Sequence, residues 1–154
     1  MAKEIERKYL IDVEKWGMQG TPIAMVQAYL VVLPDKTVRI RRAGEKAFIT
    51  IKGNRQGITR DEFEYSIPVV DAIELLKLCG DFSVEKTRYI QEVNGKKWEI
   101  DVFHGKNEGL IVAEIELHSE EESIKLPEWI IREVSLEEKY FNFNLATKPY
   151  STWE

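Results

Sequence analysis

The chain has 154 residues and a formal net charge of −5 at pH 7. Its length fits one domain over residues 1–154 with a real hydrophobic core, and its acidic charge gives no reason to expect nucleic acid as a partner. No apolar run approaches the ~18 residues that a membrane-spanning helix needs. One cysteine cannot form an internal disulfide, which suits a reducing cytoplasm, and two histidines do not indicate a zinc site. We therefore expect a cytoplasmic protein, and the lack of a long apolar run predicts no membrane partner.

The first predicted strand covers residues 3–12. Because strand side chains alternate between two faces, Glu4, Glu6 and Lys8 project in the same direction, which places two carboxylates beside one ammonium group. Taken alone, this pattern is also that of a solvated edge strand. The same alternation of charged and apolar residues recurs in later strands, and that recurrence favours a shared site.

A β-hairpin follows, centred on Gly44 and Glu45. Three successive strands are predicted, over residues 24–33, 37–43 and 46–53. Glycine at the first central position suits a two-residue type II′ turn, and this turn would pair Arg39 with Thr50. Directly opposed residues share a face of the sheet, so one basic patch is expected. Its members are Arg39, Arg41, Thr50 and Lys52.

Pro68 separates the next predicted strand from a helix. Residues 58–67 form a strand in which Glu62 and Glu64 lie on one face, and residues 69–79 carry apolar residues at helical spacing. We expect this helix to pack on the outside of a sheet.

A second hairpin is centred on Asn94-Gly95, the strongest short-range hairpin signal. Strands over residues 82–93 and 96–103 meet there in a type I′ turn, and the resulting register pairs Arg88 with Asp101. Four charged side chains thereby share a face: Lys86, Arg88, Glu99 and Asp101.

The last predicted strand covers residues 110–118, where Glu114 and Glu116 share a face. Two segments of the form Ser-x-x-Glu follow, and this form is that of a helix capping box. The one at Ser119 predicts a short helix, and the one at Ser135 predicts a final helix.

About eight strands, mostly joined by hairpins or short loops, favour a mainly β (α+β) fold: a closed eight-stranded antiparallel barrel with a few flanking helices. Charged residues occupy one face, and the opposite positions are largely apolar, among them Ile40, Ile51, Phe63 and Ile100. Two arrangements are open, because either face could line the barrel. The charged face is rich in arginine and paired acids and poor in Ser, Thr, Asn and Gln, which favours a charged interior.

An interior with both signs of charge suits a metal ion together with a polyanion. Carboxylate oxygens prefer Mg²⁺ or Mn²⁺, whereas Arg and Lys bind phosphate oxygens, Arg through a bidentate fork. We therefore expect a small-molecule polyphosphate as the substrate and Mg²⁺ or Mn²⁺ as the cofactor. No P-loop and no serine or cysteine nucleophile is evident.

The charged pairs resemble, in order, the motifs of the CYTH superfamily, the triphosphate tunnel metalloenzymes. Glu4-x-Glu6-x-Lys8 is similar to the family signature, and the later pairs are similar to motifs on its successive strands. The later pairs lie in Arg39-x-Arg41, Thr50-x-Lys52, Glu62-x-Glu64, Glu85-Lys86-x-Arg88, Glu99-x-Asp101 and Glu114-x-Glu116. The likeness is closest to the short bacterial members.

This resemblance implies an eight-stranded tunnel that hydrolyses a triphosphate with a divalent cation. It implies metal ligands at Glu4, Glu6 and Glu116. It implies phosphate-binding bases at Lys8, Arg39, Arg41, Lys52, Lys86 and Arg88. It implies catalytic acids at Glu64, Asp101 and Glu114, with supporting acids at Glu62 and Glu99.

The leading hypothesis is an inorganic triphosphatase that cleaves tripolyphosphate to pyrophosphate and phosphate. Class IV adenylate cyclase, thiamine triphosphatase and nucleoside triphosphatase are the alternatives within the family, and a non-catalytic polyphosphate-binding module is the alternative outside enzymes. Glu138 stands where short bacterial members often have lysine, which leaves the role of that position open. The sequence also leaves open whether the protein forms a homodimer.

Overall fold

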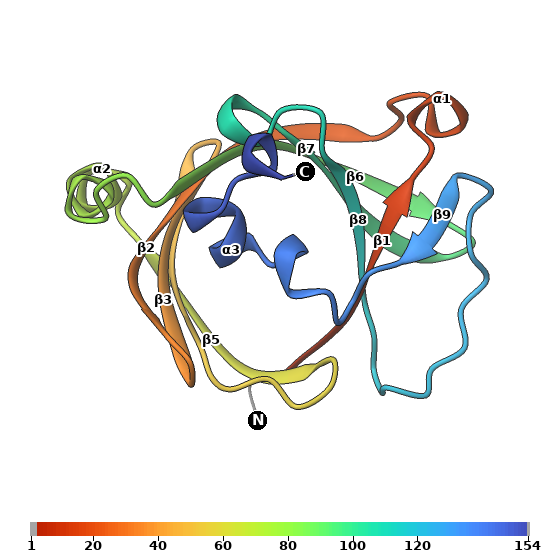
Figure 1. The fold of residues 1–154 in the computed structure, drawn as a ribbon, viewed down its shortest axis with the longest axis horizontal. Helices are drawn as coiled ribbons and strands as arrows, with labels where there is room; N and C mark the ends of the chain where they lie inside the picture. Colours follow the sequence, from red (N-terminus) through yellow and green to blue (C-terminus); the bar gives the residue numbers. More distant parts are fainter. Residues whose placement is uncertain (1–2, 154) are drawn as a thin grey trace.

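Eight antiparallel strands close into a barrel in the computed structural model, which describes residues 3–153 (Figure 1). They are β1 (Lys3–Ile11), β2 (Thr21–Leu33), β3 (Lys36–Ala43), β4 (Lys46–Lys52), β5 (Thr59–Ile67), β6 (Ser83–Val93), β7 (Lys96–Phe103) and β8 (Ile111–Glu116). Their order in the sheet is β5-β4-β3-β2-β6-β7-β8-β1, and pairing of β1 with β5 closes the ring. The predicted barrel is therefore confirmed, with a ninth strand, β9 (Ile130–Glu133), added beside β1.

Strand β1 joins the two sides of the barrel by changing partners along its length. Residues 3–5 pair with β5, where Glu4 lies opposite Arg60. Residues 6–10 pair with β8, where Glu6 lies opposite Glu116 and Lys8 opposite Glu114. The N-terminal motif therefore lies between the acidic strands β5 and β8, which are far apart in the sequence.

Both predicted hairpin registers are confirmed. Arg39 pairs with Thr50 across β3 and β4, and Arg88 pairs with Asp101 across β6 and β7. In the second turn Asn94 and Gly95 have φ angles of 53° and 75°, as a type I′ turn requires at both central positions. Each turn fixes the side of the sheet on which the charged residues of its strands lie.

Helix α2 (Val69–Leu78) packs on the outside of β2, β3 and β4, as predicted. Beneath it lies a core cluster composed of Ala28, Ile40, Ala47, Ala72 and Cys79. This helix does not cover the whole apolar face, because Ile51 and Phe63 on β4 and β5 remain 38% and 44% exposed. The outward apolar face is therefore only partly covered at this part of the barrel.

The outer face of β1, β7 and β8 is covered by other segments. Helix α1 (Val13–Trp16) brings Trp16 to this face, and the segment before β9 brings Trp129. The ring centroids of Trp98 and Trp129 lie 5.4 Å apart in an edge-to-face arrangement. Together with Tyr9 and Ile115 they form a core on the outside of the barrel wall.

The C-terminal segment fills part of the barrel interior, and Figure 1 shows it in blue across the opening. It contains the 3-10 helix η2 (Glu138–Tyr140), helix α3 (Asn142–Thr147) and η3 (Tyr150–Thr152). Val134, Tyr140 and Leu145 of this segment pack against inward-facing Phe103 and Val112. An apolar plug therefore occupies one part of the barrel, next to the charged positions of the same strands.

One predicted strand start and two predicted helix starts are wrong. Strand β2 begins at Thr21 and includes Pro22, so the connection before it is shorter than expected. No helix follows Ser119; its carbonyl oxygen instead accepts a hydrogen bond from the Glu122 backbone N–H in a turn. The predicted final helix is present as α3, but it begins at Asn142 rather than after Ser135, whose Oγ accepts a hydrogen bond from the backbone N–H of Lys8. Across residues 3–153, no helix combines the length and the hydropathy needed to cross a bilayer.

Candidate active site

A cavity of about 170 Å³ lies inside the barrel, and we call it the tunnel cavity. It is lined by Glu4, Glu6, Arg39, Arg41, Lys52, Glu62, Glu64, Arg88, Glu99, Glu114, Glu116 and Asn142. Every lining residue is polar, with seven acids and four bases among them. The charged face of the strands therefore points inward, and the apolar face points outward.

Most of the residues predicted for the site line this cavity, and three do not. Lys8 lies against an adjoining small cavity, 3.9 Å from the Oε1 atom of Glu114. Lys86 and Asp101 lie in the wall with their side chains fully buried. The two hairpin registers thus bring the predicted residues together, but at two different depths.

Asp101 is enclosed by two bases. Its Oδ2 lies 2.7 Å from Lys86 Nζ, and both of its oxygens accept hydrogen bonds from Arg88, at 2.8 and 2.9 Å. Burial raises the pKa of Asp101, but the charges of Arg88 and Lys86 outweigh burial and hold it below the usual value. Burial lowers the pKa of Lys86 to about 7, although the charge of Asp101 opposes this shift. Because Arg88 donates to Asp101 through Nε and Nη2, its Nη1 remains free to donate to Glu99 Oε2, at 3.1 Å.

Two amide side chains, those of Gln27 and Asn142, complete the wall. Neither was predicted from the sequence as part of the site. Gln27 Oε1 accepts a hydrogen bond from Arg41 Nε at 2.9 Å, and Gln27 Nε2 donates to Asn142 Oδ1 at 3.1 Å. The same Asn142 oxygen accepts from Lys86 Nζ at 3.2 Å. A polar residue within the apolar run 24–33 was the signal that could have identified Gln27. Helix α3 is thereby connected to the bases of the tunnel.

Arg39 is positioned by its neighbours on β4 and β5. Its Nη2 donates to Thr50 Oγ1 at 3.2 Å, and Thr50 Oγ1 donates to Glu64 Oε2 at 2.8 Å. Arg39 Nε is buried and has no hydrogen-bond partner within the described residues. That N–H can donate to an oxygen of a ligand, because a buried donor without a partner is costly.

The acids around Glu4 repel one another. Lys52 Nζ lies 2.8 Å from Glu4 and 3.3 Å from Glu62. Burial raises the pKa of Glu62 to about 7, and the neighbouring Glu4 carboxylate adds to the shift. Burial also raises the pKa of Glu4, but the charges of Lys52 and Arg39 and the hydrogen bond from Lys52 together lower the pKa below the usual range. For Glu6, burial and then the charges of Glu114 and Glu4 raise the pKa well above its usual value.

The donor chemistry of this acidic wall fits a hard divalent cation. Glu4, Glu6 and Glu116 offer only carboxylate oxygens, and Glu4 Oε1 is buried without a hydrogen-bond partner among the described residues. Between residues 3 and 153, no three potential ligand side chains are already grouped closely enough to hold a metal ion. Binding a cation would therefore require these side chains to move together, and the added charge would relieve their repulsion.

Comparisons with known proteins agree with this architecture. The chain is 41% identical, over its whole length and 99% of the relative, to an inorganic triphosphatase from Acetivibrio thermocellus. It is 34% identical to an inorganic triphosphatase from Nitrosomonas europaea, covering 93% of this chain and 96% of that protein. A crystal structure of the inorganic triphosphatase NE1496 superposes with a TM-score of 0.67 at 31% identity, covering 95% of each chain.

The match to a family model extends over nearly the whole barrel. Residues 2–150 match the CYTH domain, a range that includes every charged pair of the tunnel and the C-terminal segment as far as Tyr150. The protein is therefore a member of the CYTH domain family.

Proposed function

We propose that this protein hydrolyses inorganic tripolyphosphate to pyrophosphate and phosphate in its tunnel cavity, with a divalent cation. The observation that carries the proposal is the wholly polar lining of the cavity, in which seven acids and four bases meet. Acids at this density suit a cation, and bases suit phosphate oxygens. The names of the two curated relatives, both inorganic triphosphatases, support the same substrate.

The bases hold the phosphate chain. Arg39, Arg41, Lys52 and Arg88 line the cavity, so their N–H groups can reach phosphate oxygens directly. Lys8 and Lys86 act from the adjoining wall. Because these groups are fixed before the substrate arrives, they need little reorganisation as charge develops in the transition state.

Glu4, Glu6 and Glu116 would hold the cation, which we take to be Mg²⁺ or Mn²⁺. The bound cation supplies neutralisation of phosphate charge and polarisation of the terminal phosphoryl group. Glu62 and Glu99 support the bases, since they pair with Lys52 and Arg88.

We assign orientation of the attacking water to Glu114. Burial raises the pKa of Glu114, but the charges of Lys8 and Arg88 outweigh burial and lower it, so the carboxylate is ionised and can accept a hydrogen bond from water. Water adds to the terminal phosphorus, the bond to the bridging oxygen breaks, and pyrophosphate leaves with the electron pair. Glu64 positions Arg39 through Thr50, and Asp101 positions Arg88 and Lys86, so neither needs to touch the substrate.

The size of the cavity favours an inorganic substrate. Pockets for organic ligands usually measure about 300–1,000 Å³, whereas the tunnel cavity measures about 170 Å³ and has no apolar lining residue. A nucleoside or thiamine group would find no apolar surface there. Cyclase, nucleoside triphosphatase and thiamine triphosphatase activities are therefore less well supported.

A substrate panel tests the proposal. Tripolyphosphate, ATP and thiamine triphosphate are each incubated with Mg²⁺, with Mn²⁺ and with EDTA, and phosphate, pyrophosphate and cyclic AMP are measured. We expect metal-dependent release of phosphate and pyrophosphate from tripolyphosphate at the highest kcat/KM. Cyclic AMP as the main product from ATP, or equal turnover in EDTA, would overturn the assignment.

A matched pair of variants tests the metal ligands. Glu6→Gln should abolish turnover while the fold persists, and it should also remove the rise in melting temperature that Mg²⁺ causes in the wild type. Glu85→Gln is the control, because Glu85 is exposed on the outer face of β6. Full activity of Glu6→Gln would remove that residue from the metal site.

A further inference from the structure

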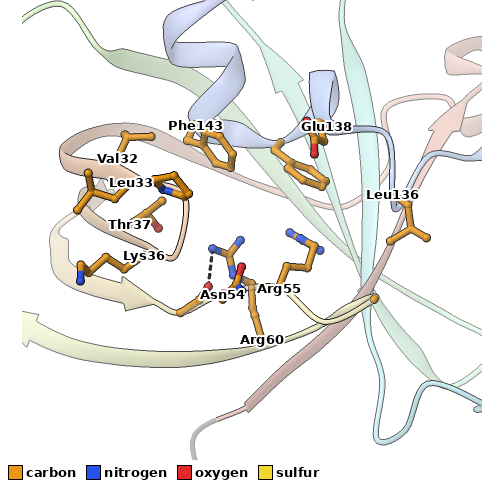
Figure 2. A pocket seen from close by; sticks show the side chains of 14 residues that line it. Val32, Leu33, Lys36, Thr37, Asn54, Arg55, Arg60, Leu136, Glu138 and Phe143 are labelled. Atoms are coloured by element: carbon orange, nitrogen blue, oxygen red, sulfur yellow. Dashed lines mark hydrogen bonds between the residues drawn. The ribbon is translucent and has the colours of Figure 1, made fainter.

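A second cavity, of about 680 Å³, lies beside the tunnel, and we call it the vestibule. It is lined by residues 32–37, the loop at residues 53–57 with Arg60, and the C-terminal segment from residue 136 to 143. Figure 2 shows Phe143 on one side and Arg55 and Arg60 on the other, with both guanidinium groups directed into the space between. None of these three side chains has a role in the proposed hydrolysis in the tunnel cavity.

The vestibule has the positive charge that an anion requires. Lys36, Arg55 and Arg60 line it, with Glu138 as the one acid in its lining. Within residues 3–153, neither Arg55 nor Arg60 forms an ion pair, and Lys36 pairs only with exposed Asp35 at 3.7 Å. Arg55 and Arg60 therefore remain available to a ligand, whereas the Lys36 side chain points away from them (Figure 2).

Arg60 provides an independent sign of a missing partner. It is only 9% exposed, its Nη2 donates to the backbone oxygen of Gly53 at 3.1 Å, and its Nε has no hydrogen-bond partner among the described residues. A buried donor of this kind is costly unless a ligand or water accepts from it. Its place in the lining of the vestibule identifies where such an acceptor would lie.

The vestibule also has surfaces on which a flat ring can stack. The Arg55 guanidinium lies 4.2 Å from the centre of the Phe141 ring, which leaves its other face available. Phe143 lines the same space, with its ring centre 5.9 Å from that of Phe141. Val32, Leu33 and Leu136 supply apolar wall. The volume is that of pockets which hold organic ligands.

A small cavity of about 30 Å³, which we call the neck, lies between the vestibule and the tunnel cavity. Arg55, Arg60 and Phe141 line both neck and vestibule, whereas Glu6, Arg39 and Lys52 line both neck and tunnel. A space of this size holds about one water molecule, so it separates the two cavities. If the vestibule received only the uncharged end of a tunnel substrate, its own bases would have no ligand charge to neutralise.

We propose that the vestibule is a binding site, separate from the tunnel, for an aromatic ring that carries a phosphate group, the chemistry of a mononucleotide. Arg60 binds the phosphate, and Arg55 and Phe143 stack on the ring. Glu138 weakens the site, because it is the one negative charge in the lining.

Titration calorimetry of the full chain with AMP in EDTA tests the proposal, with adenosine and inorganic phosphate as separate probes. AMP should bind at least ~10-fold more tightly than either probe, since ring and phosphate each contribute. Saturating tripolyphosphate should leave AMP binding unchanged. Absence of AMP binding, or its displacement by tripolyphosphate, would overturn a separate site.

Three variants locate the ligand. Arg55→Ala should weaken AMP binding ~10-fold or more, and Glu138→Gln should strengthen it by about two- to fivefold. Arg42→Ala is the control, since Arg42 follows Arg41 on β3 and points to the other face. Equal effects of Arg55→Ala and Arg42→Ala would contradict the assignment, as would weaker binding by Glu138→Gln. Neither Arg55 nor Glu138 is buried, so their substitution leaves the core intact.

Discussion

The Nζ atom of Lys86 lies 2.7 Å from Oδ2 of Asp101, and neither side chain has any exposed surface. Arg88 binds the same carboxylate through two nitrogens. The negative charge of Asp101 therefore holds the positive charges of Lys86 and Arg88 at the wall of the tunnel cavity. Without it, the two bases would repel each other at close range in a poorly solvated place.

Asp101→Asn tests this relationship. The variant keeps the shape of the side chain but removes the charge, so we expect the KM for tripolyphosphate to rise at least ~10-fold and the free energy of unfolding to fall by about 3–5 kcal/mol. Steady-state kinetics and urea denaturation measure the two effects. Asp81→Asn, at an exposed position, should change neither. An unchanged KM together with unchanged stability would contradict the positioning role of Asp101.

Arg41 and Arg42 are adjacent in the chain but lie on opposite faces of β3. Arg41 lines the tunnel cavity, so Arg41→Ala should raise the KM for tripolyphosphate by at least ~10-fold. This is the effect expected from the loss of one charge-assisted hydrogen bond to the substrate. Arg42→Ala should leave it within about twofold. Equal effects in the two variants would show that the charged face does not bind the substrate.

Glu62→Gln should change how stability depends on pH in the absence of metal. The pKa of Glu62 is about 7 in the folded protein and near 4.5 when the group is unperturbed, so the folded state binds more protons between these values. The wild type therefore loses stability relative to the variant as pH rises from 4.5 to 7, and the loss is complete above 7.

At pH 8 we expect Glu62→Gln to be more stable than the wild type by about 1–3 kcal/mol, and at pH 4 to be nearly equal to it. Urea denaturation in EDTA at the two pH values measures the difference. A stability gain of the same size at pH 4 and pH 8 would show that ionisation of Glu62 is not its cause.

Leu145→Ala tests the C-terminal plug. Leu145 is 1% exposed and packs inside the barrel with Phe103 and Tyr140, so the substitution should lower the free energy of unfolding by about 2–5 kcal/mol. Leu78→Ala is the control, because Leu78 is 74% exposed on α2. Similar losses in the two variants would show that the plug contributes little to stability.

Prediction of strand pairing from the sequence was most accurate where a short turn fixes the register. Asn94-Gly95 and Gly44-Glu45 each determine which residues of the two adjoining strands are opposed, and both pairings were predicted. It was least accurate where local signals compete with tertiary contacts. Ser135 has the form of a helix cap, but its hydroxyl instead binds the backbone of Lys8 and the carboxylate of Glu133.

The sequence by itself determined which side chains share a face, because side-chain direction alternates along a strand and each short turn sets one register. Only the tertiary structure decided how deep each charged group lies. Asp101 and Glu99 have the same direction on β7, but Asp101 is enclosed by Lys86 and Arg88 whereas Glu99 lines the tunnel cavity. How deeply a side chain is buried depends on the closure of the barrel and on the plug, which bring together residues more than a hundred positions apart. A local sequence pattern does not predict such contacts.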